Sequence, residues 1–209
     1  MGQPTRPAYN PGMAAPRWSI HKFALLFALA LLARGVPAAD SGPVSLRGFT
    51  NDLGQVIEAD SPRGATTLMV FGYTSCPDVC PLTLVAVHQA LAQLAKRGLS
   101  CDVAFVTVDP DRDTVPRLHD YVGAFDAKIR AYRGEEALLD RLTRSMKVRY
   151  WREKLYPDAP DYFMSHTPTL FLLSAQGRIM KRIEHSPDTI KLRAGIIDAI
   201  VSVNGGSAR

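Results

Sequence analysis

Short apolar runs alternate along this chain with longer segments whose apolar residues recur at helical spacing, from about residue 44 onward. The apolar runs predict strands over residues 67–73, 102–108, 169–173 and 179–183. The helical spacing predicts helices over residues 82–96, 114–125, 134–147 and 187–203. This order predicts an α/β fold in which a central mixed sheet is flanked by helices on both faces.

Turn residues refine this prediction at both ends of the domain. Residues 46–50 and 55–58 flank the turn signal Asn51-Asp52-Leu53-Gly54, which predicts a short N-terminal β-hairpin. Residues 174–178 contain Gly177 and predict the loop of a second hairpin between the last two strands. In open α/β sheets, reactive groups gather beyond the carboxyl ends of the strands, and two cysteines lie just beyond the strand predicted at 67–73.

The first 38 residues resemble an export signal. An apolar run of eleven residues, 23–33, follows the basic residues Arg17 and Lys22, and Val36-Pro37-Ala38 offers small residues for cleavage after Ala38. A bilayer-spanning helix needs about 20 apolar residues, and this run is shorter. A cleaved signal peptide is therefore the first interpretation, and an uncleaved membrane anchor is the alternative. We therefore expect a signal peptide or weak anchor over 1–38 and a domain over 39–209, located in the periplasm or anchored in the inner membrane facing it.

Length and charge set further limits. The 209 residues suffice for one domain with its own core, and the hydrophobic and charged fractions of 46% and 22% are ordinary for a globular protein. The formal net charge is +5, but residues 1–38 contain four basic residues and no acidic one, which leaves +1 for the rest. We accordingly expect no nucleic-acid partner.

Cys76 and Cys80 are the strongest chemical signal in the sequence, because Pro77 and Pro81 follow them directly. Two thiols at this spacing can form a disulfide, attack one, or bind a soft metal ion. Pro81 lacks an amide hydrogen, so we expect Cys80 at the helix N-cap with Pro81 as the first helical residue. The positive end of the helix dipole then favours both thiolates. A purely structural disulfide is less plausible, because so short a loop adds little stability.

His166 is the candidate third ligand. It precedes the strand at 169–173, and Thr167-Pro168 resembles the cis-proline segment that packs against the cysteine turn in thioredoxin-like proteins. Two thiolates and one imidazole suit Cu(I), are acceptable for Cu(II), and can hold Zn²⁺ with an added water. Met164 is a further soft donor, although core packing is the simpler interpretation. The remaining histidines are interpreted as structural or solvated: His21, His88, His119 and His185.

Three segments together resemble the Sco/SenC family of copper-binding proteins with a thioredoxin-like fold. They are FGYTSCPDVCP at 71–81, VTVDPDRDT at 106–114, and His166, which lies 86 positions after Cys80. The resemblance covers about residues 44–203. It implies copper bound by Cys76, Cys80 and His166, and delivery of copper to the binuclear copper centre of cytochrome c oxidase. The implied partners are subunit II of that oxidase and another copper chaperone.

The chain departs from the family at two positions beside the histidine. Members commonly carry an acidic residue where this chain has Ser165, and many lack a proline where it has Pro168. Both differences favour the alternative function, a thiol–disulfide oxidoreductase with Cys76 and Cys80 as its redox pair. A peroxidase of the peroxiredoxin type is disfavoured, because Thr74 and Cys76 do not reproduce the spacing of that family.

Three further features receive structural interpretations. Cys101 leaves an odd thiol, expected to be reduced, partly buried and remote from the cysteine loop. In the segment 109–113, Arg112 is expected to pair with neighbouring acids, and Asp113 or Thr114 to cap the following helix; docking of a partner there rests on the family alone. The basic residues between 141 and 154 are interpreted as a solvated face.

Overall fold

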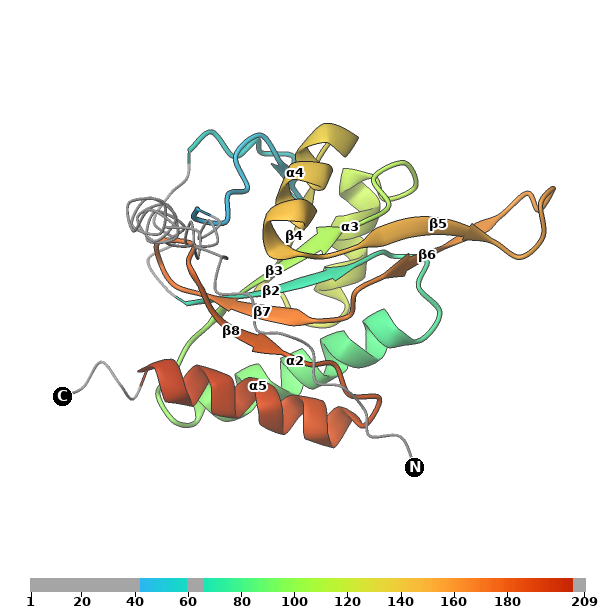
Figure 1. The fold of residues 1–209 in the computed structure, drawn as a ribbon. Coiled ribbons are helices and arrows are strands. Elements are labelled where there is room, and N and C mark those ends of the chain that lie inside the picture. The colour runs from blue at the N-terminus through green and yellow to red at the C-terminus, as the bar shows by residue number, and fades with distance from the viewer. Residues whose placement is uncertain (1–41, 60–65, 205–209) are drawn as a thin grey trace, which may run out of the picture. The chain divides into compact units, whose positions relative to one another are not determined.

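Six strands form the central sheet of the computed structural model, which describes residues 42–59 and 66–204 (Figure 1). Their order across the sheet is β1-β4-β3-β2-β7-β8. The strands are β1 (Thr50–Asn51), β2 (Thr67–Gly72), β3 (Asp102–Thr107), β4 (Ile129–Arg133), β7 (Leu170–Leu173) and β8 (Ile179–Ile183). The three at the centre, β4, β3 and β2, are parallel, whereas β1, β7 and β8 run antiparallel to their neighbours. The sheet is therefore mixed, as predicted.

The core lies on both faces of this sheet, because alternate residues of each central strand point to opposite sides. In β2, Leu68 and Val70 join the cluster on one face, whereas Met69 and Phe71 join the cluster on the other. Every residue of β2 is buried. A strand covered on both faces is recognised by a continuous apolar run, and this explains why β2 was predicted from sequence.

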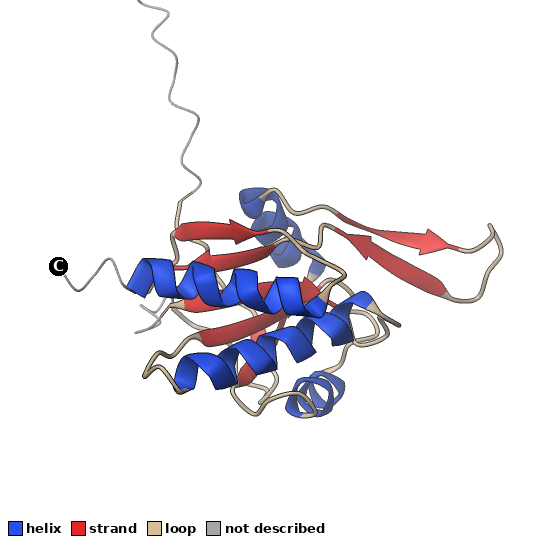
Figure 2. Ribbon diagram, turned by 90° about the horizontal axis from the view of Figure 1, so that it is seen from below, coloured by secondary structure: helices blue, strands red, loops and turns tan. Residues whose placement is uncertain are grey.

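Four helices cover the two faces, and all four were predicted. They are α2 (Val79–Ala95), α3 (Val115–Gly123), α4 (Glu136–Met146) and α5 (Thr189–Asn204). The buried apolar residues of α3 and α5, and those of α2 except Cys80, belong to one cluster. Cys80 and the buried apolar residues of α4 belong to the cluster on the opposite face, together with residues of the segment 44–49. Figure 2 shows α2 and α5 side by side across one face.

The predicted N-terminal hairpin is also present. Gly48 N donates to Ile57 O at 2.8 Å and Ile57 N donates to Phe49 O at 2.8 Å. At the turn, the side-chain oxygen of Asn51 accepts the backbone N–H groups of Leu53 and Gln55. This pattern is typical of an Asx turn, which explains why the Asn-Asp-Leu-Gly signal was informative.

Three strands were not predicted: β4 in the sheet, and the two strands of a separate ribbon. The ribbon consists of β5 (Tyr150–Lys154) paired antiparallel with β6 (Tyr162–His166), and it projects away from the rest of the domain (Figure 1). Four of the five residues of β5 are exposed, so its sequence has no apolar period to detect. The expectation of a solvated face for the basic residues between 141 and 154 is correct for exposure, but it missed the strand.

Two local expectations were wrong. Helix α2 begins at Val79 with Asp78 as its N-cap, so Cys80 and Pro81 lie inside the first turn. The first N–H groups of a helix have no intrahelical acceptor, so Pro81 sacrifices no hydrogen bond there. The peptide bond before Pro168 is trans, since none of the described peptide bonds is cis.

The expected leader over 1–38, including His21 and the cleavage position after Ala38, lies outside the described residues. All described residues belong to one structural unit, Ser41–Arg209. Among them, no helix combines the length and the apolar character needed to cross a membrane.

Candidate metal centre

The cysteine turn connects the end of β2 to the first turn of α2. The backbone N–H of Cys80 donates to the Cys76 sulfur at 3.3 Å. Cys80 is buried, Cys76 is half-buried, and both are free thiols. A backbone N–H from the first helical turn thus faces the Cys76 sulfur, which is the stabilisation of a thiolate that the sequence predicted.

Gly72 permits the turn to pack closely. A Cβ atom at this position would lie 2.7 Å from the Phe105 ring and 3.1 Å from the Cys80 sulfur. A side chain there would therefore displace either the core ring or the thiol. Glycine is required at this position for close approach.

A buried carboxylate, Asp113, holds the residues that precede Cys76. It accepts hydrogen bonds from Thr74 N at 3.1 Å, from Thr74 Oγ1 at 2.5 Å and from Thr107 Oγ1 at 2.5 Å. Arg117 extends this network, since its guanidinium donates to Thr74 Oγ1 at 2.6 Å and to Ser75 Oγ at 3.0 Å. Of the two residues expected to cap the following helix, Asp113 or Thr114, it is Thr114 that makes the cap, by accepting from Arg117 N.

His166 reaches the cysteine turn from the last position of β6. Its Nε2 atom lies 3.9 Å from the Cys80 sulfur. Its Nδ1 atom lies 3.0 Å from the carbonyl oxygen of Thr167. A carbonyl oxygen only accepts hydrogen bonds, so Nδ1 carries the proton and the lone pair of Nε2 faces the sulfur. The structure thus brings the histidine next to the cysteine turn, as expected.

These donors suit a soft first-row metal ion. Zinc bonds of about 2.3 Å to sulfur and about 2.0 Å to nitrogen fit a sulfur–nitrogen separation of 3.9 Å at an S–metal–N angle near 130°. A Cu(I) or Cu(II) ion prefers this combination of thiolate and imidazole. Within the described residues, no three His, Cys, Asp or Glu side chains already form a closed metal site. The two sulfurs and the imidazole nitrogen therefore lie near one another, and they would move to bonding distance around a bound metal ion.

The electrostatic environment gives the two thiols different pKa values. A hydrogen bond with Cys80 lowers the pKa of the Cys76 thiol to about 6, with further help from the backbone of Cys80 and Asp78, while burial opposes the change. The same interaction with Cys76, together with burial, raises the pKa of Cys80. In the metal-free protein, Cys76 is thus the thiolate and Cys80 the proton donor.

Burial lowers the pKa of His166, and the hydrogen bond to Thr167 opposes this effect. The imidazole is therefore neutral at neutral pH and available as a ligand. Burial lowers the pKa of His185, and the charge of Asp78 opposes this effect. The charge of His185 in turn contributes to the lowered pKa of His166, so His185 lies near the site. The histidines on α2 and α3 are structural, since His88 contacts Asp126 at 3.0 Å and His119 contacts Asp52 at 3.2 Å.

The position before the histidine has a carboxylate partner. Ser165 Oγ donates to Glu153 Oε2 at 2.6 Å, across the β5–β6 ladder. The family resemblance led us to expect an acidic residue at position 165, and in this chain the neighbouring strand supplies a carboxylate to Ser165. Met164 is buried in the cluster that also contains Cys80 and Phe71, in agreement with core packing.

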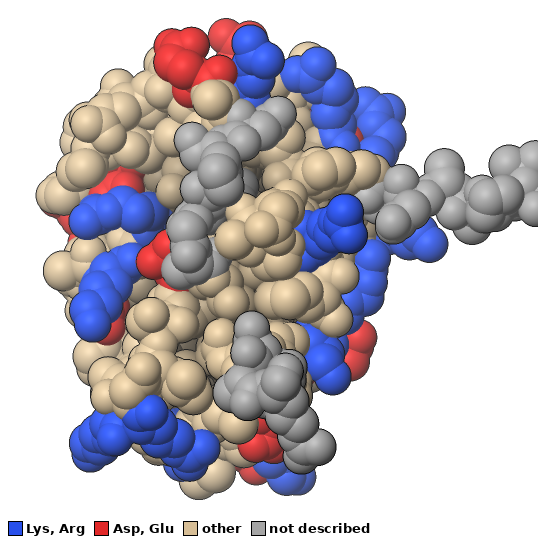
Figure 3. Space-filling view, turned by 90° about the vertical axis from the view of Figure 1, so that its left-hand side faces the viewer, with Lys and Arg blue, Asp and Glu red and all other residues tan. Residues whose placement is uncertain are grey.

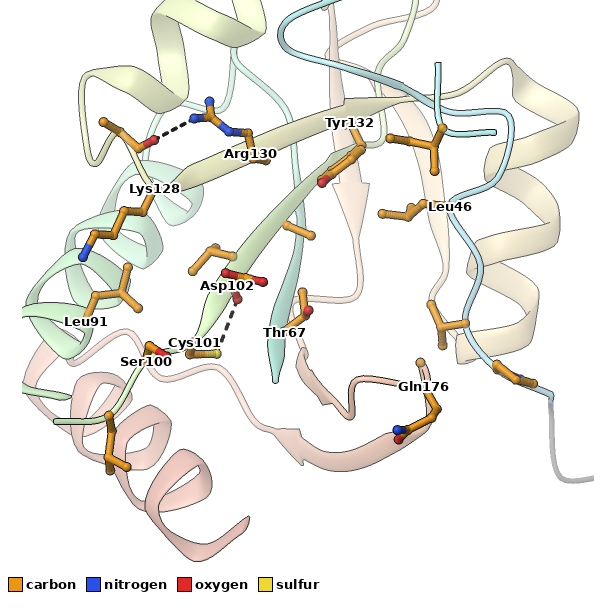
Figure 4. A pocket seen from close by; sticks show the side chains of 18 of the residues that line it. Leu46, Thr67, Leu91, Ser100, Cys101, Asp102, Lys128, Arg130, Tyr132 and Gln176 are labelled. Carbon is orange, nitrogen blue, oxygen red and sulfur yellow. Dashed lines mark hydrogen bonds between the residues drawn. The ribbon is translucent and has the colours of Figure 1, made fainter. Parts of the chain in front are cut away.

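Cys101 lies at the opposite end of the sheet from the cysteine turn, just before β3. It is buried, and burial raises the pKa of its thiol to about 12. It lines a cavity of about 1130 Å³ together with Thr67, Leu91 and Lys128 (Figure 4). The expectation that Cys101 lies remote from the cysteine loop is correct, although the residue is buried rather than partly buried.

Charged side chains are mixed over the face of the molecule shown in Figure 3. Groups of Lys and Arg are separated by uncharged residues and by Asp and Glu. The basic residues of 141–154 also have local partners: Arg144 pairs with Asp140 at 3.0 Å, and Arg152 pairs with Asp111.

This fold and this site define a class of protein: a thioredoxin-like domain that holds a dithiol turn opposite a histidine from a later strand. The model of the SCO1/SenC family matches residues 48–201, and the chain belongs to this family. Members of the family take part in copper handling and in the assembly of cytochrome c oxidase.

Curated relatives agree with this assignment. The "SCO2-like protein" of Rickettsia felis is 32% identical over 139 residues, which cover 66% of this chain and 68% of the relative. "Protein SCO1 homolog 1, mitochondrial" of Arabidopsis thaliana is 30% identical over 164 residues, which cover 78% of this chain. The match spans 48% of the Arabidopsis protein, so this chain corresponds to about half of that relative.

Solved structures are similar as well. The copper-bound ScoI of Arabidopsis thaliana has a TM-score of 0.67 and 28% identity, over 78% of this chain and 99% of that one. The copper-bound ScoI of Bradyrhizobium japonicum has a TM-score of 0.59 and 29% identity, over 73% of this chain and 97% of that one. The thioredoxin-like fold inferred from the sequence is thereby confirmed.

Sequence reasoning missed the residues that position the site. The side chain of Tyr73 interacts with the Cys76 sulfur, which helps to lower the pKa of that thiol. Tyr73 also interacts with the backbone of Met164. Tyr162 and Asp109 form a hydrogen bond of 2.8 Å beside the histidine strand. The only sequence signal for these contacts was the segment 106–114, which was interpreted as a cap and a local ion pair.

Proposed function

We propose that this protein binds one copper ion through Cys76, Cys80 and His166 and delivers it to the binuclear copper centre of cytochrome c oxidase. The observation that supports this best is the 3.9 Å approach of the neutral Nε2 atom of His166 to the Cys80 sulfur. Family membership and the copper-bound relatives agree with it.

The residues act as follows. Cys76 is the thiolate that meets the metal first, because it is the more exposed sulfur and has the lowered pKa. Cys80 loses its proton on metal binding, and His166 supplies a neutral nitrogen. Because thiolate ligands exchange readily between sites, an incoming thiolate of the acceptor can replace Cys76 first, while the buried Cys80 and His166 still hold the ion.

Copper titration of the reduced full-length protein tests metal binding. We expect one Cu(II) per chain, with sulfur-to-copper charge-transfer absorption that disappears in the Cys80→Ser variant. An identical spectrum in that variant would remove Cys80 from the ligand set.

Delivery needs a second measurement. Copper-loaded protein is mixed with the metal-free, copper-binding domain of oxidase subunit II, and the metal on each protein is quantified after separation. Copper that stays on this protein would leave binding intact but contradict delivery.

A second function, reduction of a partner disulfide, is favoured by the lowered pKa of Cys76 and the free Cys80 thiol beside it. The Cys76 thiolate would attack a partner disulfide, form a mixed disulfide and release one partner thiolate. Cys80 would then lose its proton and attack the Cys76 sulfur, which closes the Cys76–Cys80 disulfide and releases the second partner thiol. Two electrons pass to the partner. Inertness of the metal-free protein toward the oxidised oxidase domain would eliminate this function.

We further propose that the domain works outside the cytosol, after export or anchoring through residues 1–38. The apolar run at 23–33 and the small residues before position 39 support this. N-terminal sequencing of the protein recovered from the periplasm tests it, with Ala39 expected as the first residue after cleavage.

A further inference from the structure

The segment Asp109–Asp113 lies between the two halves of the proposed copper site. The sulfur half is the cysteine turn, and the histidine half is the strand β6 that ends at His166. It follows β3 directly, and both of its end residues are buried: Asp109 is 1% exposed and Asp113 is 0% exposed. Buried carboxylates require partners, and each of these two has its own set.

Asp113 binds the sulfur half of the site. As described above, it accepts hydrogen bonds from Thr74 N and Thr74 Oγ1, two positions before Cys76. The third donor is Thr107 Oγ1, at the end of β3, and the same Oγ1 accepts from Asp109 N at 3.0 Å. Asp113 therefore fixes the start of the cysteine turn to the end of the sheet.

Asp109 and Arg112 bind the histidine half. Tyr162, at the start of β6, donates its hydroxyl to Asp109 Oδ1 at 2.8 Å. Arg112 Nη1 donates to the carbonyl oxygen of Tyr162 at 2.9 Å, and the guanidinium lies 3.7 Å from the centre of the Tyr162 ring. A hydrogen bond and a cation–π contact thus hold the same residue of the strand that ends at His166.

Arg112 also connects the two halves to each other. Its Nε atom lies 2.5 Å from Asp109 Oδ2, and its guanidinium lies 5.9 Å from the ring of Tyr73, which precedes the cysteine turn. The planar guanidinium uses its edge for the carboxylate and the carbonyl and its face for Tyr162, which a lysine cannot do.

The ribbon needs such support, because a two-stranded β-ribbon is only marginally stable in water by itself. Its strands pair with each other and with no strand of the central sheet. The placement of β6 therefore depends on contacts with the rest of the domain. Arg112 and Asp109 hydrogen-bond to Tyr162 at the loop end of this strand, and His166 lies at its other end, opposite Tyr150.

We propose that Asp109–Asp113 is a brace that sets the distance between the thiols and His166, with Arg112 and Asp109 as positioning residues for the imidazole. This inference rests on the proposed copper site. It assigns to the segment a role in metal affinity that goes beyond a helix cap or a local ion pair.

A double-mutant cycle on copper affinity tests the brace. Because supporting residues of a metal ligand commonly contribute about 10- to 100-fold to affinity, Arg112→Lys should weaken binding of Cu(II) by about 10-fold. Its sulfur-to-copper absorption should remain, while the nitrogen hyperfine coupling in the electron paramagnetic resonance spectrum weakens. In the His166→Ala background, Arg112→Lys should cause no further loss, because it acts through the imidazole.

A smaller substitution and a matched control complete the test. Tyr162→Phe removes only the hydroxyl bonded to Asp109 and should lower the affinity in the same direction. Tyr156→Phe removes the same group from the loop that joins β5 to β6, where Tyr156 is 56% exposed, and should leave the affinity unchanged.

The outcomes separate the brace from the proposed function. Wild-type protein without sulfur-to-copper absorption would overturn both. Normal wild-type binding with unchanged affinity in folded Arg112→Lys and Tyr162→Phe proteins would overturn the brace alone. Equal, additive losses in the wild-type and His166→Ala backgrounds would also overturn it, because a general loss of structure does not act through His166.

Discussion

The imidazole Nδ1 of His166 lies 3.0 Å from the backbone carbonyl oxygen of Thr167, the next residue in the chain. This one contact fixes the proton on Nδ1 and leaves the lone pair of Nε2 available to a metal ion. Because the acceptor is a backbone atom, the orientation does not depend on another side chain. Position 165 is a serine where the family resemblance led us to expect an acidic residue, yet the nitrogen that faces Cys80 still has its lone pair free.

Replacement of His166 by alanine should weaken copper binding while the thiolates still hold the ion. We expect Cu(II) affinity to fall by at least about 10-fold, the range seen when ligand shells are disrupted. Sulfur-to-copper absorption should persist at a shifted wavelength. Competition titration with a chelator measures the affinity.

His185→Ala is the matched control, because His185 lies close enough to affect the pKa of His166 but faces neither sulfur in a recorded contact. It should keep the wild-type affinity within experimental error. An equal loss in both variants would show that a general disturbance near the site, and not removal of a ligand, causes the effect.

The two thiols should react at different pH values in the metal-free protein. The pKa of Cys76 is about 6, so its alkylation rate should rise with a midpoint near pH 6, whereas Cys80 and Cys101 should stay unreactive at neutral pH. Alkylation followed by peptide mass spectrometry measures each site separately. The pH series runs from about 4 to about 9, which includes both the expected Cys76 midpoint and the ordinary thiol pKa.

Cys80→Ala should shift the Cys76 midpoint upward, since the hydrogen bond with Cys80 is the main cause of the lowered pKa. The same pKa shift determines how the stability of the folded protein changes with pH. A lowered pKa of an acid in the folded state stabilises that state above the ordinary thiol pKa, and this contribution is lost as the pH falls through about 6. A midpoint unchanged by Cys80→Ala would contradict the assignment of roles.

Substitution of Gly72 by alanine should destabilise the protein and disturb the site together. The new Cβ would lie 2.7 Å from the Phe105 ring and 3.1 Å from the Cys80 sulfur. Overpacking of this kind costs about 1–3 kcal/mol of unfolding free energy. Chemical denaturation measures the cost, and copper titration measures the effect on the sulfur.

Gly123→Ala offers the control, because nothing lies within 4 Å of a Cβ at that helix position. It should be neutral or raise the unfolding free energy by up to about 1 kcal/mol. Equal stability in the two variants would show that the close contact at Gly72 is relieved elsewhere.

Cys101→Ser should keep one copper ion per chain and the wild-type spectrum. The thiol is buried at the far end of the sheet, and its raised pKa keeps it protonated at neutral pH. The hydroxyl can keep the contact with the carbonyl oxygen of Asp102, so the loss of unfolding free energy should stay near 1 kcal/mol. Loss of bound copper in this variant would make Cys101 part of the metal chemistry.

Where burial leaves a periodic pattern, the sequence sufficed to predict structure. Helices α2 and α5 were predicted because their apolar residues recur at helical spacing, and strand β2 was predicted because it is a continuous apolar run, buried on both faces. Strand β4 was missed because Arg130 and Arg133 interrupt its apolar residues. The ribbon was missed because β5 is exposed along nearly its whole length. Pro81 misled the prediction of the helix start, because a helix tolerates proline within its first turn.

The sequence by itself determined the chemistry: two thiols at the start of a helix, a remote histidine, and a family pattern that relates them. Only the tertiary structure decided how these groups meet. The 85 residues between Cys80 and His166 include most of the ribbon, whose Tyr162 contacts Arg112 and Asp109 from a distant part of the chain. Such contacts depend on distances and directions in three dimensions, which residue spacing along a chain does not encode.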